Sequence, residues 1–228
     1  MNSQTDNTTA HSASDYDTGV LQTIPFYTEF HAQVIRLVSA YQPSPNSWLD
    51  TGCGTGNLIA KCCAEFPDTA FTLSDPSEKM LAVAKEKLGA YSQNISFLPP
   101  APTQDISVNS RFDVITAIQA HHYLSVQERA DTAKVCHRLL NPNGLFITFE
   151  NIRPLTDIGT EIGLKSWYTY QREKGKTEDE AKAHIDRFGK EYFPVTVSAH
   201  LDLYRACGFR VVELLWYAHM QAGFYCIK

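Results

Sequence analysis

Two kinds of hydrophobic spacing alternate along the chain. Short and nearly continuous apolar runs are typical of strands buried on both faces of a sheet. Such runs end at Trp48-Leu49 and recur at residues 70–74, 95–98, 112–118 and 145–149. Apolar residues three or four positions apart predict amphipathic helices between these strands. The helices are expected at residues 25–40, 58–66, 77–88 and 125–140, with a turn at residues 141–144. This alternation favours a parallel, doubly wound sheet.

The alternation stops after residue 150. Residues 155–193 contain two helical patterns and no strand pattern, and the second helix should begin at Thr177, where Glu180 completes a capping box. A further helix and two apolar runs follow, at residues 209–217 and 223–227, and these runs should pair antiparallel because no helix separates them. We therefore predict an α/β fold: a three-layer, doubly wound, seven-stranded sheet with its last two strands antiparallel, plus a small helical insertion.

Composition limits the domain organisation and the partners. The chain has 228 residues, 43% of them hydrophobic, which suits one domain at residues 15–228 after a polar, disordered tail at residues 1–14. The formal net charge of −5 argues against a broad nucleic-acid interface. The sequence contains no run of about 18 apolar residues, so no membrane span is predicted. The six cysteines form no CxxC pair and no secretory signal is visible, which indicates reduced thiols in a cytoplasmic protein and no metal site.

The most informative segment follows the first strand. Leu49 and Asp50 lead into T-G-C-G-T-G-N at residues 51–57, and an apolar helix begins directly afterwards. Glycines allow a tight turn and a close approach to a ligand. Asp50 can hold a cationic amine, and the start of a helix offers free N–H groups. A plain tight turn is the simpler alternative. A nicotinamide dinucleotide site would need the spacing G-x-G-x-x-G, whereas this segment has G-x-G-x-G.

This strand–Asp–GxGxG–helix arrangement, with Asp75 after the second strand and an antiparallel pair at the end, resembles the class I S-adenosylmethionine (SAM)-dependent methyltransferases. The resemblance covers roughly residues 20–228. It implies that the chain binds SAM, forms S-adenosylhomocysteine (SAH) as product, and has a substrate lid at residues 155–193. Asp50 would hold the amino group of SAM, and Asp75 would accept both ribose hydroxyls. The other cofactor-binding residues that it implies are Gly52, Gly54, Gly56, Asn57, Pro76, Met80, Ile118, Gln119 and Tyr27.

Some of these residues also have a simpler structural interpretation. Asp75 also suits a simple helix cap, and Met80 has the spacing of a core residue. In the family, an acid after the third strand accepts a hydrogen bond from the adenine amino group, but Ala101 stands at that position here. Backbone groups near Ala101, or the side chain of Gln104, are then expected to bind adenine.

The reaction that the resemblance implies requires few catalytic groups from the protein. Methyl transfer from a sulfonium is an in-line displacement, so the protein aligns the acceptor and excludes water. His121 and His122, after the fourth strand, are the candidate catalytic residues, because a neutral imidazole can take a proton from the acceptor. Local packing is the alternative for both rings. Glu150 and Arg153, after the fifth strand, are expected either to bind substrate or to pair with each other.

The leading interpretation is therefore an enzyme that moves a methyl group from SAM to an O, N or S atom of a small-molecule acceptor. Aromatic residues of the first helix and of the insertion are expected to wall the acceptor or to pack the insertion onto the sheet. Residues 192–228 are similar to the end of the carboxy-SAM synthases, which use an arginine in the helix before strand six. Leu203 stands there in this chain, so ordinary SAM is preferred. A carboxy-SAM synthase, a tRNA-modification enzyme and a non-catalytic SAM-binding protein remain alternatives, and a homodimer is an open possibility.

Overall fold

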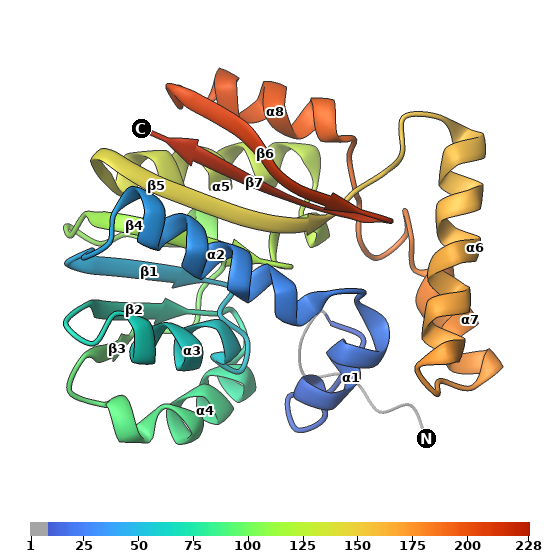
Figure 1. Cartoon of the computed structure of the whole chain (residues 1–228), viewed down its shortest axis with the longest axis horizontal. Helices are drawn as coiled ribbons and strands as arrows, with labels where there is room; N and C mark the ends of the chain where they lie inside the picture. Colours follow the sequence, from blue (N-terminus) through green and yellow to red (C-terminus); the bar gives the residue numbers. More distant parts are fainter. Residues whose placement is uncertain (1–8) are drawn as a thin grey trace.

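A seven-stranded sheet with helices on both faces forms the centre of the computed structural model, which describes residues 9–228 (Figure 1). The strands are β1 (Ser47–Thr51), β2 (Ala70–Ser74), β3 (Ile95–Phe97), β4 (Phe112–Ile118), β5 (Leu140–Asn151), β6 (Val211–Ala218) and β7 (Gln221–Ile227). The α-helices are α1 (Tyr16–Thr23), α2 (Tyr27–Tyr41), α3 (Asn57–Glu65), α4 (Glu78–Lys87), α5 (Val126–Leu139), α6 (Asp157–Glu173), α7 (Glu178–Asp186) and α8 (Val197–Ala206). Short 3-10 helices lie at η1 (Gly89–Tyr91), η2 (Thr103–Asp105) and η3 (His121–Tyr123).

The strand order is β3-β2-β1-β4-β5-β7-β6. Strands β1 to β5 pair in parallel, and β7 runs antiparallel to both β5 and β6. The predicted fold class is confirmed, including the antiparallel pair at the end of the chain. From β1 the order runs outward through β2 and β3 in one direction and through β4 in the other. An open parallel sheet binds ligands at such a switch point, beyond the carboxyl ends of its strands.

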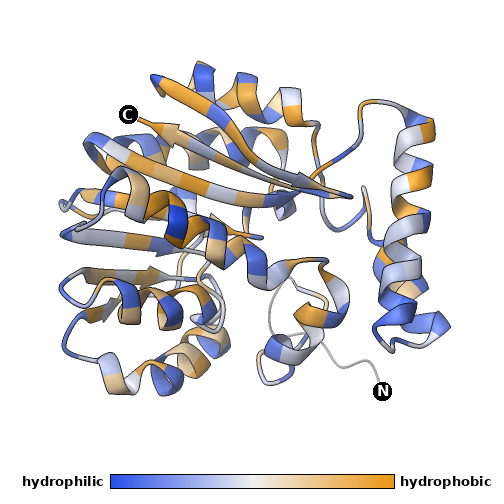
Figure 2. Ribbon diagram, in the orientation of Figure 1, coloured by the Kyte–Doolittle hydropathy of each residue, from blue (hydrophilic) through white to orange (hydrophobic). Residues whose placement is uncertain are grey.

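Successive side chains of a strand point to opposite faces of the sheet, so alternate strand residues contribute to two separate cores. Trp48 packs with Phe71 and Phe149 in the core beneath α2, α3 and α4, whereas the adjacent Leu49 joins Phe146 in the core beneath α5 and α8. All seven residues of β4 are buried, as its apolar run predicted. Figure 2 shows the resulting concentration of hydrophobic residues in the strands, with hydrophilic residues on the outer sides of the helices.

The helical insertion contains α6 and α7, and it stands beyond the carboxyl ends of β1 and β4, beside α1 (Figure 1). The capping box of α7 is confirmed, because Glu180 N–H donates to the Thr177 hydroxyl at 3.3 Å and Thr177 N–H donates to the Glu180 carboxylate at 2.7 Å. Trp167 is fully buried and its indole N–H donates to Thr23 O at 2.6 Å. The insertion is therefore joined to the N-terminal helix as well as to the sheet.

Two local predictions were wrong. The tail prediction covered residues 1–14; residues 1–8 lie outside the described part, but residues 9–14 pack against α1, with His11 Nε2 and Thr23 Oγ1 at 2.9 Å and Ala13 buried. Polar residues satisfied by local hydrogen bonds gave no apolar signal, and α1 itself was missed for the same reason. The expected turn at residues 141–144 lies inside β5, where pairing jumps from Phe112–Leu140 to Val114–Leu145 and the intervening residues bulge out.

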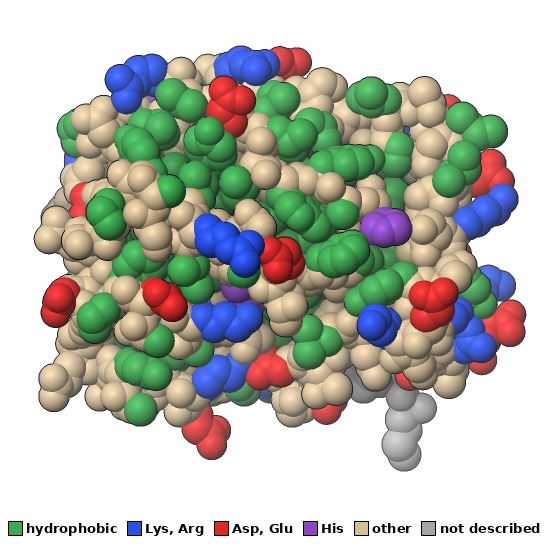
Figure 3. Space-filling view, in the orientation of Figure 1, with side chains coloured by type: hydrophobic (Ala, Val, Ile, Leu, Met, Phe, Trp, Pro, Cys, Tyr) green, Lys and Arg blue, Asp and Glu red, His purple; other side chains and the backbone are tan. Residues whose placement is uncertain are grey.

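The outer edge of the sheet is β6, and part of its outward surface is apolar. Leu214 and Tyr217 are 43% and 54% exposed, and Figure 3 shows hydrophobic side chains spread over this face of the molecule. Homodimerisation stays a prediction, since only one copy of the chain is described. Within residues 9–228, no helix combines the length and apolar character that crossing a membrane requires.

The packing between β5 and β7 generates a stability prediction. A Cβ on Gly223 would lie 2.5 Å from the Phe149 ring, which is itself stacked on Phe30 with ring centroids 4.7 Å apart. Gly223→Ala should therefore lower the free energy of unfolding by about 2 kcal/mol, as overpacking does. Gly89→Ala is the matched control, because nothing lies within 4 Å of its Cβ position, and it should change stability by less than about 0.5 kcal/mol. Denaturant titration measures both, and equal effects would contradict this account of the core.

Candidate active site

The loops that follow β1, β2, β4 and β5 meet at one edge of the sheet, around the switch point between β1 and β4. Each loop contributes residues that the sequence singled out. The residues are Asp50 and the glycine loop after β1, Asp75 after β2, Gln119 to His122 after β4, and Glu150 at the end of β5. The parallel strands thus bring residues up to 100 positions apart into one region, as expected for a ligand site of this fold class.

The glycine loop follows a path that only glycine takes without strain. Gly52, Gly54 and Gly56 all have positive φ, at 62°, 54° and 78°. A Cβ on Gly52 would lie 2.6 Å from the Ala120 side chain, and one on Gly56 would lie 2.9 Å from Leu88. The loop therefore sits tightly against the segment after β4 and against α4, and the first turn of α3 begins at its end with N–H groups free of helical partners.

Asp75 holds this loop in place. One carboxylate oxygen accepts a hydrogen bond from Gly54 N–H at 2.9 Å, and the other accepts from Ser77 N–H at 2.9 Å. The cap of α4 is the Ser77 hydroxyl, which accepts from Met80 N–H, so Asp75 does not have the simple helix-cap role. Burial, the largest influence, raises the pKa of Asp75 even though these two N–H groups oppose the rise. A carboxylate in this state gains from further hydrogen-bond donors.

Asp50 is the most deeply buried acid of the glycine-loop region. Its Oδ1 accepts a hydrogen bond of 2.6 Å from the Thr116 hydroxyl, which also accepts one from the Trp48 indole at 2.9 Å. Burial raises the pKa of Asp50 to about 7, the Thr116 hydrogen bond lowers it, and the charge of Asp75 raises it further. No lysine or arginine pairs with Asp50 in the described structure. A bound cation would therefore stabilise its charged form.

Two tyrosines from the N-terminal helices cover the loop. Tyr16 comes from α1, and its ring carbon lies 3.9 Å from the Cβ position of Gly54. Tyr27, at the start of α2, is buried next to Tyr16 and Asn57, and burial raises its pKa to about 12. Tyr27 therefore lies near the glycine loop, and its contact with a cofactor stays a prediction.

A polar cluster that sequence reasoning missed fixes α1 onto the loop. Asp17 accepts hydrogen bonds from Thr55 at 2.6 Å and from the Asn57 amide at 2.8 Å, and it pairs with Lys87 of α4 at 2.6 Å. Lys87 also donates to the Asn57 side-chain oxygen at 2.6 Å. The Asn57 side chain is thus used inside the protein. No spacing in the sequence connects Asp17 with Lys87, because 70 residues separate them.

Gln119 carries a buried side-chain amide with no protein partner. Its backbone has φ of 56°, rare for a residue with a side chain, and its N–H donates to Phe149 O at 2.7 Å. Both amide atoms, Nε2 and Oε1, are buried without a hydrogen-bond partner among the described residues. Ile118, the last residue of β4, is buried beside it. Unpaired buried polar atoms and strained backbone both occur preferentially at ligand sites.

Glu150 is the centre of a buried network at the end of β5. It accepts hydrogen bonds from the backbone N–H groups of His121 and His122 and from the Thr148 hydroxyl, and it bonds His122 Nδ1 at 2.9 Å. Burial favours the neutral acid, but the hydrogen bond and charge of His122, with His121 and Thr148, hold the Glu150 pKa down at about 2. The expected alternative of a Glu150–Arg153 pair is therefore wrong, because Glu150 bonds His122 instead, whereas substrate binding by Glu150 stays a prediction.

Arg153 points elsewhere. Its guanidinium pairs with Asp157 at 2.7 Å on the surface. Arg129 is the arginine close to Glu150, buried in α5 and donating to the carbonyls of His121, Leu124 and Phe193. Phe193 lies at the end of the insertion, so Arg129 joins the segment after β4 to the end of the insertion.

The two histidines after β4 occupy different surroundings. The His121 ring lies against Phe146 of the core beneath α5 and α8, with centroids 6.3 Å apart, and burial lowers its pKa to about 4. The His122 ring lies between Glu150 and Asn151, whose amide nitrogen is 3.2 Å from Nε2. Because ionised Glu150 can only accept, Nδ1 of His122 carries a proton. A catalytic role for either ring stays a prediction, and these contacts favour a positioning role.

The expected adenine end of the site is less complete. Met80 is buried in α4 and Pro76 is exposed, while Ala101 is half-buried in the loop after β3. The Gln104 side chain accepts a hydrogen bond from Thr132 of α5 at 3.2 Å, so it is already used within the protein. In residues 9–228, no three His, Cys, Asp or Glu side chains come together as a metal site.

Comparisons with known proteins agree with this arrangement. Residues 49–146, from the end of β1 into the middle of β5, match the family model described as "Methyltransferase domain". The chain shares its fold with DesVI from Streptomyces venezuelae, at a TM-score of 0.67 and 17% identity over 94% of this chain and 97% of that one. It also shares its fold with the N-methyltransferase NodS from Bradyrhizobium japonicum, solved in complex with SAH, at a TM-score of 0.63 and 15% identity, covering 90% and 88%.

Residues 49–146 therefore match a methyltransferase domain, and the chain as a whole has the fold of SAM-dependent methyltransferases. Its relatives by sequence include carboxy-SAM synthases. The synthase of Campylobacter lari is 22% identical over 90% of this chain and 86% of its own, and that of Campylobacter concisus is 26% identical over 88% and 85%.

The Glu150 network generates a prediction about stability and pH. Glu150→Gln leaves four donors without a charged acceptor, so it should lower the free energy of unfolding at pH 7 by about 3 kcal/mol. The depressed pKa of Glu150 means that its ionised form stabilises the fold above about pH 4.5, the ordinary glutamate range, and that this contribution is lost as pH falls towards 2. The difference between the variant and the wild type should narrow over that window. Glu213→Gln, at an exposed site of β6, is the control. A constant difference across the window would contradict the assignment.

Proposed function

We propose that the protein transfers a methyl group from SAM to a small-molecule acceptor and forms SAH. One observation carries the proposal. Asp50 and Asp75 are buried carboxylates with raised pKa values at the switch point of the sheet, next to a loop of positive-φ glycines. A ligand that offers both a cationic amine and neighbouring hydroxyls compensates both acids. The methionine and ribose parts of SAM supply these groups.

The chain's own residues suggest how SAM would be held. Asp50 would hold the ammonium group, and the glycine loop and the first turn of α3 would approach the methionine part closely. Asp75 would accept the ribose hydroxyls while it keeps the loop folded through Gly54. The unpaired amide of Gln119 would provide hydrogen bonds to the ligand. SAM supplies the electrophilic methyl group and the leaving group, so the protein needs no nucleophile.

Tyr16, Tyr27 and the insertion would exclude water and align the acceptor. The insertion is bonded to α1 through Trp167, and α1 is bonded to the glycine loop through Asp17, so the lid and the cofactor loop are mechanically connected. Most aromatic residues here pack on one another: Phe30 on Phe149, and Trp167 on His184. Their main role is therefore packing, within the core and within the insertion, with Tyr16 and Tyr27 nearest the glycine loop. The acceptor atom and the cytoplasmic location stay predictions from sequence.

A carboxy-SAM synthase is the second candidate, because relatives with that name match the chain over most of their length. The arginine expected of that branch is replaced by Leu203, whose side chain packs against the core beneath α5 and α8. Ordinary SAM is therefore our preferred ligand. Calorimetry with SAM and with carboxy-SAM decides between them, and a tighter carboxy-SAM complex by tenfold or more would replace the first proposal with the second.

Removing either buried charge should weaken cofactor binding. Asp50→Asn and Asp75→Asn should each raise the Kd for SAH at least tenfold, about 1.4 kcal/mol. Both variants should fold, because a neutral amide removes a charge that burial disfavours. Asp68→Asn is the matched control, since Asp68 is an exposed acid in the turn before β2, at the opposite edge of the sheet. Titration calorimetry gives the three constants, and unchanged affinity in both test variants would refute the proposal.

The raised pKa of Asp50 predicts a pH dependence of binding. The acid is largely protonated at pH 6 and must lose that proton to hold a cationic amine. With a pKa of about 7, SAH affinity should rise about tenfold between pH 6 and pH 8. Asp50→Asn should lose most of this rise, leaving the smaller contribution of Asp75. An unchanged pH profile in the variant would show that another group is responsible.

A further inference from the structure

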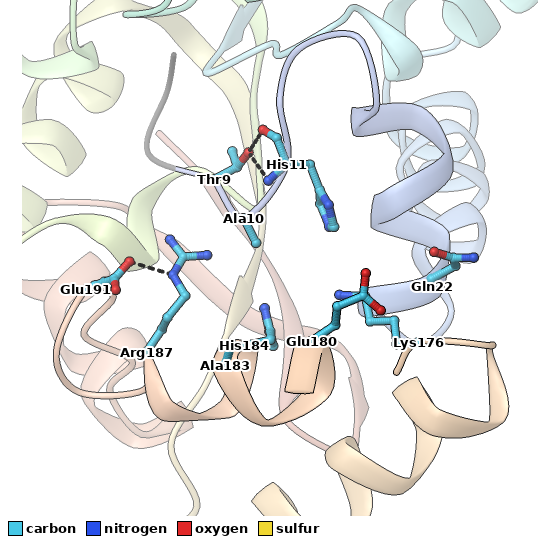
Figure 4. Close-up of a pocket in the computed structure, with 10 residues that line it drawn as sticks. All are labelled: Thr9, Ala10, His11, Gln22, Lys176, Glu180, Ala183, His184, Arg187 and Glu191. Carbon is cyan, nitrogen blue, oxygen red and sulfur yellow. Dashed lines mark hydrogen bonds and ion pairs between the residues drawn. The ribbon is translucent and has the colours of Figure 1, made fainter. Parts of the chain in front are cut away.

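A cavity lies between the insertion and the N-terminal part of the chain, and none of its lining residues belongs to the glycine loop. Its volume is about 550 Å³, and residues of the N-terminal segment, of α1 and of α7 line it (Figure 4). His11 and Gln22 form one side, and Lys176, His184 and Arg187 form the other. This volume is that of a small-molecule site rather than of a packing defect. The cavity belongs to none of the cofactor interactions described above.

His184 gives the cavity a polar group that the protein does not satisfy. The residue is only 7% exposed, and both ring nitrogens lack a hydrogen-bond partner among the described residues. Its ring is held by Trp167, with centroids 4.9 Å apart, and by Tyr192, at 6.0 Å. Figure 4 shows the ring rising from α7 between Arg187 and Glu180. A buried imidazole without a partner costs free energy, which a ligand in the cavity would recover.

The charges around this imidazole favour an anion. Lys176 is half-buried, and its ammonium donates to Gln171 Oε1 at the long distance of 3.3 Å. Burial is the largest cause of the lowered pKa values of His11 and His184, and Lys176 and Arg187 follow as the next causes for both rings. The two imidazoles that line the cavity therefore lie near the positive charges of Lys176 and Arg187.

Two acids also line the cavity, but donors of the protein already engage each of them. The carboxylate of Glu180 accepts from the Thr177 N–H and hydroxyl in the capping box of α7. The carboxylate of Glu191 accepts from Arg187 Nε at 2.6 Å. Both acids are exposed, and these contacts direct each of them at a donor of the protein.

We propose that this cavity binds the carboxylate or phosphate group of a small molecule, with Lys176 and His184 as its principal contacts. The ammonium of Lys176 supplies the charge, and the His184 ring, fixed by Trp167 and Tyr192, supplies a directed N–H. A ligand here contacts α7, α1 and the N-terminal segment at once, so it would hold the insertion against the N-terminal helix. This site does not depend on SAM binding.

Calorimetry on the full chain tests the proposal with malonate, inorganic phosphate and the neutral analogue malonamide. At least one of the two anions should bind with one site per chain, and malonamide should bind at least tenfold more weakly than malonate if malonate is that anion. Lys176→Gln should weaken anion binding at least tenfold. Lys182→Gln is the matched control, because Lys182 lies nearby in α7, lines the groove towards α6 instead of this cavity, and gives the same change of charge.

His184→Gln should also weaken the anion at least tenfold, and SAH affinity should stay unchanged in all three variants. Lys176→Gln alone decides the case if the His184 variant does not fold. The proposal is overturned if neither anion binds at millimolar concentration, if malonamide competes equally with the bound anion, or if Lys176→Gln binds like the wild type. If the wild-type chain did not bind SAH, that result would refute the proposed function and would not affect the proposal for this cavity.

Discussion

A carboxylate that leaves water must be compensated by hydrogen-bond donors or by a cation, and this requirement governs the carboxyl edge of the sheet. Three acids are buried there: Asp50, Asp75 and Glu150. Glu150 has four donors, and its pKa falls to about 2. Asp50 has one hydroxyl and Asp75 has two backbone N–H groups, and both pKa values rise. The protein therefore completes one carboxylate by itself and leaves two that a ligand would complete.

This difference distinguishes the acid that supports the structure from the two acids that a ligand would contact. The Glu150 network fixes the segment after β4, including the orientation of the His122 ring, and Arg129 joins the same segment to the end of the insertion. Asp75 in turn fixes the glycine loop, and Asp17 fixes α1 onto it. The lid, the cofactor loop and the end of β4 are consequently connected through buried polar contacts.

Sequence periodicity predicted the regular parts of the fold because burial on both faces leaves an unmistakable apolar run, as in β4, and because a capping box marks the start of α7. It predicted Asp50, the glycine loop and Asp75 because each follows a strand end within a short motif. It missed α1 and the Asp17–Lys87 pair, which depend on polar contacts between residues 70 positions apart. It offered Arg153 as one possible partner of Glu150 from proximity in the chain, whereas the fold brings His122 to Glu150 from the neighbouring strand end. Local patterns thus located the site, and long-range polar contacts decided the partners.

The most direct test of the account is a crystal structure of the full chain with SAH. The account predicts the ammonium group of SAH at the carboxylate of Asp50, the ribose hydroxyls at Asp75, and a hydrogen bond from the ligand to the amide of Gln119. Asp75 should still accept the N–H of Gly54 in that complex. The central claim would be contradicted if SAH were bound without contacting the carboxylate of Asp50 or that of Asp75.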